Sequence, residues 1–142
     1  MTNGGFAALA LAFRVLLEYG TEKDAASAAS SLAQVSLRTG QGEPAEEQAR
    51  QALKLLGDRV DAVDEIGNAQ LVLGRSLMEQ GRLNEAAQAF EEAEHSFDQL
   101  SSVSHRAAAW IAKGDLAVRR GQDQVAAQLY RRAAEALQDF RF

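Results

Sequence analysis

A chain of 142 residues, 46% of them hydrophobic, is long enough to bury a core and fits a single domain, residues 1–142. Its formal net charge of −5 argues against general nucleic-acid binding, and its lack of cysteine excludes disulfides and cysteine-ligated zinc. Strong helix formers (Ala, Leu, Glu, Gln and Arg) are abundant and there is one proline, so the composition predicts an all-α protein.

The opening stretch MTNGGFAALALAF contains an apolar run but does not resemble a secretory signal. No basic segment precedes the run, and no cleavage-like site follows it. No part of the sequence approaches the roughly 18 consecutive apolar residues of a membrane span. Together with the lack of cysteine, these features lead us to expect a cytoplasmic protein with no membrane partner.

Helical periodicity and glycine punctuation predict seven helices. Their expected ranges are 6–19, 24–39, 44–56, 61–80, 84–98, 103–120 and 124–138. The acidic stretch DRVDAVDE stands at the start of the fourth helix, where negative charge is stabilising. Asn84 and Asp123 are the expected N-terminal caps of the fifth and seventh helices.

Three segments, which begin at Leu32, Leu73 and Lys113, align in one register. Their turn glycines, Gly40, Gly81 and Gly121, are 41 and 40 residues apart. The other aligned positions are Ala33, Gly74 and Gly114 in the first helices, and Ala45, Ala86 and Ala126, then Ala49, Phe90 and Tyr130, then Ala52, Ala93 and Ala133 in the second helices. A period of this length indicates a repeat architecture.

Each aligned segment has the physical features of a helical hairpin. Two antiparallel helices approach closely only where side chains are small, so we expect Gly74 to lie against Ala86. Gly114 and Ala126 make the corresponding pair in the next hairpin. The turn glycines can take positive φ angles after the first helix ends. Because one hairpin cannot bury both of its faces, such hairpins must stack.

This pattern resembles the tetratricopeptide repeat, a helix–turn–helix unit of about 34 residues. The resemblance covers residues 24–138 and is most specific in AAAWIAKGDLAVRRGQDQVAAQLYRRAAEAL, where the matching residues are Trp110, Gly114, Gly121, Ala126, Tyr130 and Ala133. The period is about six residues longer than the family's. The residues that depart from the family's preferences are Ala29, Ser36, Gln70 and Lys113, the last standing where the family prefers Leu.

The resemblance implies a right-handed α-α superhelix, a solenoid of three and a half hairpins made from seven helices. The expected units are a half-repeat at 6–20, repeats at 24–57, 61–98 and 103–138, and a tail at 139–142. The N-terminal helix is the second half of an earlier repeat, because a step of 40 residues back from Ala52 reaches Ala12.

A stack of this kind offers a concave surface lined by its first helices, where a peptide or helix of another protein binds. We expect exposed apolar side chains there, with Arg75 and Arg119 orienting acidic groups of the partner. The expected groove residues are Ser30, Gln34, Leu37, Arg38, Asn68, Leu71, Arg75, Met78, Ile111, Asp115, Val118 and Arg119. The alternative is that these residues pack against further helices or are solvated.

The ends of the stack are a second candidate surface, since repeat arrays normally need polar caps. The candidate residues for self-association into a homodimer are Phe6, Leu9, Phe13, Phe140 and Phe142. The tail AAQLYRRAAEALQDFRF and the Ala-, Arg- and Leu-rich composition also resemble the C-terminal repeat region of bacterial, particularly actinobacterial, helix-turn-helix transcriptional regulators. That resemblance implies a peptide-sensing regulatory domain of a longer protein, without direct nucleic-acid binding by this chain.

No set of residues points to catalysis. The two histidines, His95 and His105, do not have a metal-binding spacing, and no phosphate-binding glycine loop is present. Ser27, Ser30 and Ser31 share a helix but have no histidine nearby in the sequence. We therefore expect no catalytic, metal-binding or cofactor-binding residue and no cofactor. The predicted function is a non-catalytic interaction module whose partner is another protein or peptide.

Overall fold

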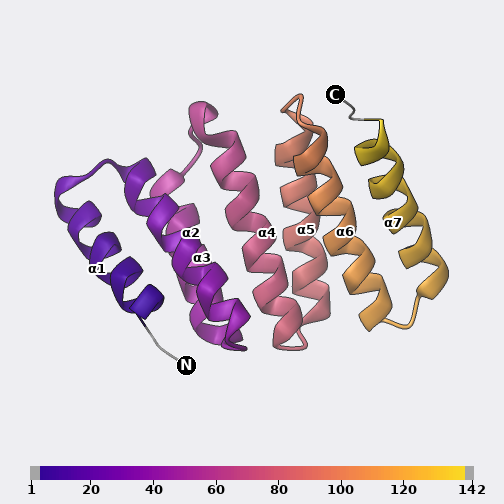
Figure 1. Cartoon of the computed structure of the whole chain (residues 1–142), viewed down its shortest axis with the longest axis horizontal. Coiled ribbons are helices and arrows are strands. Elements are labelled where there is room, and N and C mark those ends of the chain that lie inside the picture. The colour runs from indigo at the N-terminus through magenta and orange to yellow at the C-terminus, as the bar shows by residue number, and fades with distance from the viewer. Residues whose placement is uncertain (1–3, 140–142) are drawn as a thin grey trace.

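The computed structural model describes residues 4–139, which form seven α-helices joined by short connections (Figure 1). The helices are α1 (Gly4–Tyr19), α2 (Glu22–Arg38), α3 (Gly42–Leu56), α4 (Val63–Glu79), α5 (Leu83–Asp98), α6 (Val103–Arg119) and α7 (Asp123–Gln138). A short 3-10 helix, η1 (Val60–Ala62), leads into α4. Each α-helix begins and ends within two residues of its predicted range, and residues 4–139 contain no strand.

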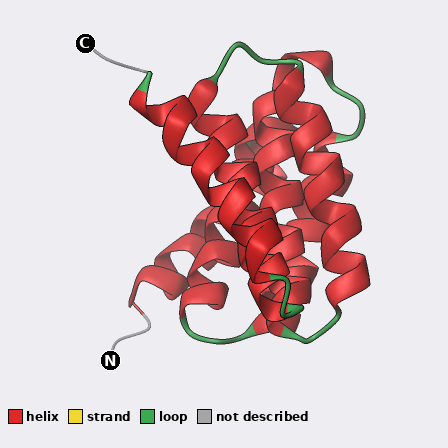
Figure 2. Cartoon of the chain, turned by 90° about the vertical axis from the view of Figure 1, so that its right-hand side faces the viewer, coloured by secondary structure: helices red, strands yellow, loops and turns green. Residues whose placement is uncertain are grey.

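The helices pair into hairpins, and the hairpins stack. α2 packs against α3, α4 against α5 and α6 against α7, while α1 packs against α2 from the N-terminal side. α3 also packs against α4, and α5 against α6, so that each hairpin continues the one before it (Figure 1). The turned view shows the connecting loops gathered at the upper and lower ends of the helices (Figure 2). The predicted all-α superhelix of three and a half hairpins is confirmed.

The turns within the three hairpins have the same geometry. Gly40, Gly81 and Gly121 have φ angles of +74°, +77° and +72°, in the left-handed region that glycine adopts without strain. In each turn the glycine N–H bonds to the carbonyl three residues back, and the next N–H bonds to the carbonyl five residues back. This pair of bonds is the Schellman end of a helix. The predicted positions of the turn glycines are therefore confirmed.

None of the three helices that follow these turns has a side-chain cap, and the predicted caps of α5 and α7 are wrong. α5 begins at Leu83 and α7 at Asp123, so Asn84 and Asp123 both lie inside their helices. The Schellman turn leads the chain into the next helix so quickly that the cap position falls on the residue directly after the glycine. The Asn84 amide oxygen instead accepts a hydrogen bond from Arg120, at the end of the neighbouring α6, at 2.8 Å.

Each of the last two hairpins closes where an aromatic ring lies against a glycine. A β-carbon on Gly74 of α4 would lie 2.3 Å from a ring carbon of Phe90 of α5, and Phe90 is fully buried. The other two pairs of this kind are Gly114 with Tyr130 and Gly67 with Phe97. The sequence predicted Gly74 against Ala86 and Gly114 against Ala126, with Phe90 and Tyr130 filling the space beside these contacts; the atoms nearest to the absent β-carbons belong to the two rings. The ring adds apolar burial that an alanine could not.

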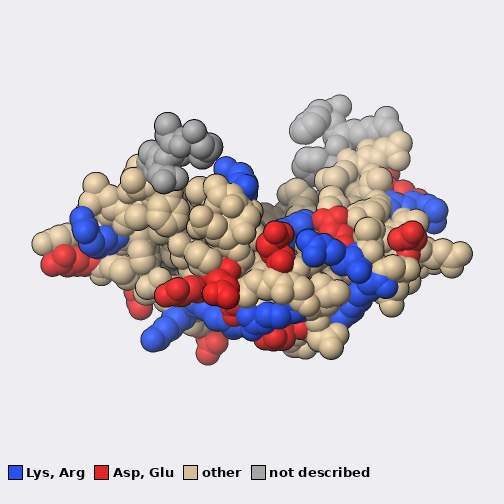
Figure 3. Space-filling view, turned by 90° about the horizontal axis from the view of Figure 1, so that it is seen from below, with Lys and Arg blue, Asp and Glu red and all other residues tan. Residues whose placement is uncertain are grey.

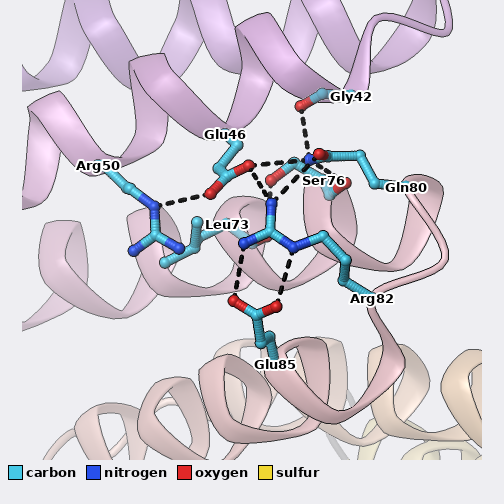
Figure 4. Close-up of polar contacts among 8 residues, drawn as sticks. All are labelled: Gly42, Glu46, Arg50, Leu73, Ser76, Gln80, Arg82 and Glu85. Carbon is cyan, nitrogen blue, oxygen red and sulfur yellow. Dashed lines mark hydrogen bonds and ion pairs between the residues drawn. The ribbon is translucent and has the colours of Figure 1, made fainter.

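A polar network holds the first full hairpin to the second (Figure 4). The carboxylate of Glu46, on α3, accepts hydrogen bonds from Arg82 at 2.7 Å and Gln80 at 3.1 Å, both in the α4–α5 turn. It also accepts one from Arg50 at 2.9 Å, and Arg82 pairs through two nitrogens with Glu85. Burial opposes the charge of Glu46, but these donors outweigh burial and lower the pKa of its carboxyl below the ordinary value.

A second polar group joins the last two hairpins. The Glu94 carboxylate on α5 accepts hydrogen bonds from Trp110 Nε1 at 3.0 Å and Lys113 Nζ at 2.6 Å, both on α6. The guanidinium of Arg132, on α7, lies 4.5 Å from the centre of the Trp110 ring, in a cation–π contact. Lys113 therefore has a structural role at a position where the tetratricopeptide repeat prefers Leu.

Gly74→Ala should lower the free energy of unfolding, because its methyl group would collide with the buried ring of Phe90. Overpacking costs about 1–3 kcal/mol, and the better helix propensity of alanine offsets up to about 1 kcal/mol of that. Urea denaturation followed by circular dichroism measures the difference. Gly5→Ala, whose methyl group meets nothing within 4 Å, is the control and should be neutral or slightly stabilising. Unchanged stability of the Gly74 variant would contradict the packing.

The lowered pKa of Glu46 predicts a loss of stability in acid. A carboxylate with a lower pKa in the folded than in the unfolded state stabilises the fold above the unfolded pKa, and this contribution disappears as the pH falls through the folded pKa. Glu46→Gln should therefore destabilise the protein at neutral pH, and its difference from the wild type should shrink below about pH 4. Chemical denaturation at a series of pH values measures this. Glu47→Gln, an exposed neighbour on α3, is the control; a pH-independent effect of Glu46→Gln would reject the explanation.

Candidate partner-binding groove

The first helices of the hairpins, α2, α4 and α6, line the inner side of the stack. α2 packs directly against α4, and α4 against α6, whereas the second helices are further apart, so the stack curves towards its first helices. The space-filling view shows the middle of the molecule hollowed between its two ends (Figure 3). Equivalent residues of successive repeats form two rows across this face: Gln34, Arg75 and Asp115 in one, and Arg38, Glu79 and Arg119 in the next.

A hollow of about 380 Å³ lies between α2 and α4, and we refer to it as the α2–α4 hollow. Its lining residues are Gln34, Leu37 and Arg38 from α2 and Leu71, Val72 and Arg75 from α4. The three aliphatic side chains also pack with the core beneath. The lining contains two arginines and no carboxylate, although the whole chain has a net charge of −5.

The neighbouring part of the face, between α4 and α6, is closed by polar contacts. Arg75 Nη1 lies 3.0 Å from Asp115 Oδ2, and the Tyr130 hydroxyl donates to the other carboxylate oxygen. That hydrogen bond raises the pKa of Tyr130 above its ordinary value. Arg119 donates to the backbone carbonyl of Met78 and lies 3.7 Å from the carboxylate of Glu79. The cations on this side therefore already have partners within the chain.

Two of the predicted groove residues are buried. Met78 is 8% exposed and packs in the central core, because α4 is the middle helix and is covered by α2, α3, α5 and α6. Ser30 is 7% exposed, and its hydroxyl has no hydrogen-bond partner in the described part of the chain. Both are corrections to the predicted groove.

The other predicted groove residues reach the surface to different degrees. Those that are exposed are Gln34, Arg38, Ile111, Val118 and Arg119, and those that are half-buried are Leu37, Asn68, Leu71, Arg75 and Asp115. The prediction missed Val72, which lines the α2–α4 hollow, and Glu79, which pairs with Arg119. The repeat offset could have identified Glu79, since it stands at the position equivalent to Arg38 and Arg119.

The N-terminal end of the stack presents an apolar surface, which the predicted residues reach to different degrees. Phe13 is half-buried against the core cluster that includes α2 and α3, Leu9 is half-buried, and Phe6 is 36% exposed. The large apolar side chains that are more exposed on α1 are Leu11, Val15, Leu17 and Tyr19. Phe140 and Phe142 lie outside the described residues.

The Ser102 hydroxyl, which caps the N-terminus of α6, is hydrogen-bonded to Nδ1 of His105. The His105 and Phe97 ring centres are 4.9 Å apart, and His95 is exposed on α5. Among residues 4–139, no three His, Asp or Glu side chains lie close enough together to hold a metal ion. In the same part of the chain, no helix has the length and hydropathy to cross a membrane.

Comparison with known proteins agrees with this architecture. Residues 71–139 match the sequence model of the tetratricopeptide repeat. The chain is similar in structure to the tetratricopeptide repeat domain of FLU from Arabidopsis, with a TM-score of 0.72 and 24% sequence identity over 83% of this chain and 98% of that domain. No curated protein matches the sequence significantly.

Proposed function

We propose that the chain is a non-catalytic module that binds a peptide or helix of a partner protein. Residues 71–139 match the tetratricopeptide repeat and the chain has the fold of a tetratricopeptide repeat domain, a fold that is generally a protein–protein interaction module. The proposed binding site is the α2–α4 hollow. The observation that supports it most directly is the composition of that hollow, which has an aliphatic floor and arginines at its rim.

The size of the hollow suits a side chain or two of a longer segment. Pockets that enclose whole small molecules are about 300–1,000 Å³, and this hollow of about 380 Å³ is open to solvent at the concave face. Burial of one large aliphatic side chain contributes about 1.5–3 kcal/mol, so a partner needs further contacts along the face. Ile111 and Val118 of α6 are exposed and extend the apolar surface beyond α4.

Closing the hollow should abolish partner binding. Gln34 is exposed at the edge of the hollow, so Gln34→Trp fills it without disturbing the core. We expect peptides selected from a displayed random library to bind the wild type and to lose at least about tenfold in affinity for this variant, the loss equivalent to about 1.4 kcal/mol. Fluorescence anisotropy measures the affinities. Gln128→Trp, on the exposed face of α7, is the matched control; equal binding by both variants would reject the groove.

Self-association through α1 is the second candidate function. Leu11, Val15 and Tyr19 are exposed and stand four residues apart, so they share one face of α1, and contiguous exposed apolar surface marks interaction sites. The opposite end of the stack differs, because the outer face of α7 exposes polar side chains such as Gln128, Arg131 and Glu135. The proposed occupant of the α1 surface is a second copy of the chain.

Light scattering after size-exclusion chromatography tests the second candidate. The wild type should shift from monomer to dimer as its concentration rises, and Val15→Glu should stay monomeric, because a buried unpaired charge opposes association. Gln128→Glu, on the outer face of α7, should dimerise like the wild type. A wild type that is monomeric at all concentrations would reject self-association. The role in a bacterial transcriptional regulator stays a prediction from resemblance.

A further inference from the structure

We infer that the α2–α4 hollow selects segments in which an Asp or Glu side chain lies close to a large aliphatic or aromatic side chain. The inference rests on the proposed function, because it names the chemistry of the partner that the same site takes. It commits to an internal acidic residue of a peptide as the charged group.

Arg38 supplies the first part of the argument. It is exposed at the rim of the hollow, and its side chain has no ion pair or hydrogen bond with any other residue in the range 4–139. The acidic residue at the equivalent position of the next repeat, Glu79, is paired with Arg119 instead. The guanidinium of Arg38 therefore has all of its donors available for a carboxylate, with which an arginine forms two parallel hydrogen bonds.

Arg75 supplies the second part. One of its terminal nitrogens, Nη1, binds Asp115, and the side chain is 34% exposed, so the rest of the guanidinium can donate to a ligand. Asp115 is in turn held by the Tyr130 hydroxyl. This chain of contacts fixes Arg75 at the edge of the hollow before a partner arrives, which reduces the entropy lost on binding.

The distribution of charge along the face sets the position of the acidic group. No carboxylate lines the α2–α4 hollow, whereas the α4–α6 side contains both Asp115 and Glu79. A ligand carboxylate is therefore attracted to the side of Arg38 and repelled from the side of Asp115.

The aliphatic floor requires an apolar neighbour for the acidic residue. Leu37, Leu71 and Val72 line the same hollow as the two arginines, so one short segment contacts both. In a bound helix the two ligand side chains would be three or four residues apart, and in an extended segment two residues apart, since these spacings place side chains on one face.

Selection and charge reversal test the inference. Random peptides with amidated C-termini are selected on the wild type, on Arg38→Glu and on Arg131→Glu, an exposed arginine on the outer face of α7. Peptides selected on the wild type and on Arg131→Glu should contain Asp or Glu close to Leu, Met or Phe. Peptides selected on Arg38→Glu should contain Lys or Arg in place of the acidic residue. Replacing the acid by its amide in one selected peptide should weaken binding to the wild type about ten- to a hundredfold in anisotropy titrations.

The possible results separate this inference from the proposed function. Two results would overturn the inference but leave the groove in place, provided that Gln34→Trp abolishes binding. In the first, the selected peptides lack an acidic residue. In the second, they bind Arg38→Glu as well as they bind the wild type. Binding that needs a free C-terminal carboxylate would overturn it as well. Failure to select any peptide, or selected peptides that still bind Gln34→Trp, would overturn the proposed function itself.

Discussion

The α4–α5 and α6–α7 hairpins, which make up half of the stack, depend on the insertion of an aromatic ring from the second helix against a glycine of the first. Phe90 lies against Gly74 and Tyr130 against Gly114, where any β-carbon at the glycine would collide with the ring. A glycine costs about 1 kcal/mol of helix stability relative to alanine. The ring contributes more apolar burial than an alanine would, and this gain outweighs the cost of the glycine, so the pair stabilises the hairpin. Gly67 with Phe97 extends the same contact along α4 and α5.

The close packing of the hairpins determines which residues lie next to each other on the concave face. Because the hairpins are alike and stack side by side, residues at equal positions in successive repeats lie next to each other, as the contact between Arg75 and Asp115, 40 residues apart, demonstrates. Between α4 and α6, opposite charges at such positions pair and close the face. Between α2 and α4 no such pair forms, because Gln34 stands opposite Arg75 and Glu79 pairs with Arg119, so the face stays open. The location of the hollow thus follows from which residues the repeats place in register.

Sequence reasoning predicted the features that depend on local geometry. A turn that needs positive φ needs glycine, so Gly40, Gly81 and Gly121 could be located from their spacing alone. It could not predict features that depend on which neighbours cover a helix. Met78 and Phe13 stand on apolar faces that periodicity identifies, but periodicity does not tell whether another helix lies over them. The predicted caps failed for a related reason, since hydrogen bonds of the turn determine where the next helix begins.

Nuclear Overhauser contacts between the ring protons of Phe90 and the α-protons of Gly74 test the central claim most directly. If the ring lies where a β-carbon would be, strong contacts should appear and ring currents should shift the α-protons of Gly74 away from ordinary glycine values. Gly5, which has no neighbour within 4 Å of the same position, should show neither effect. Ordinary shifts for Gly74 together with no contact to Phe90 would contradict the account of how the hairpins close.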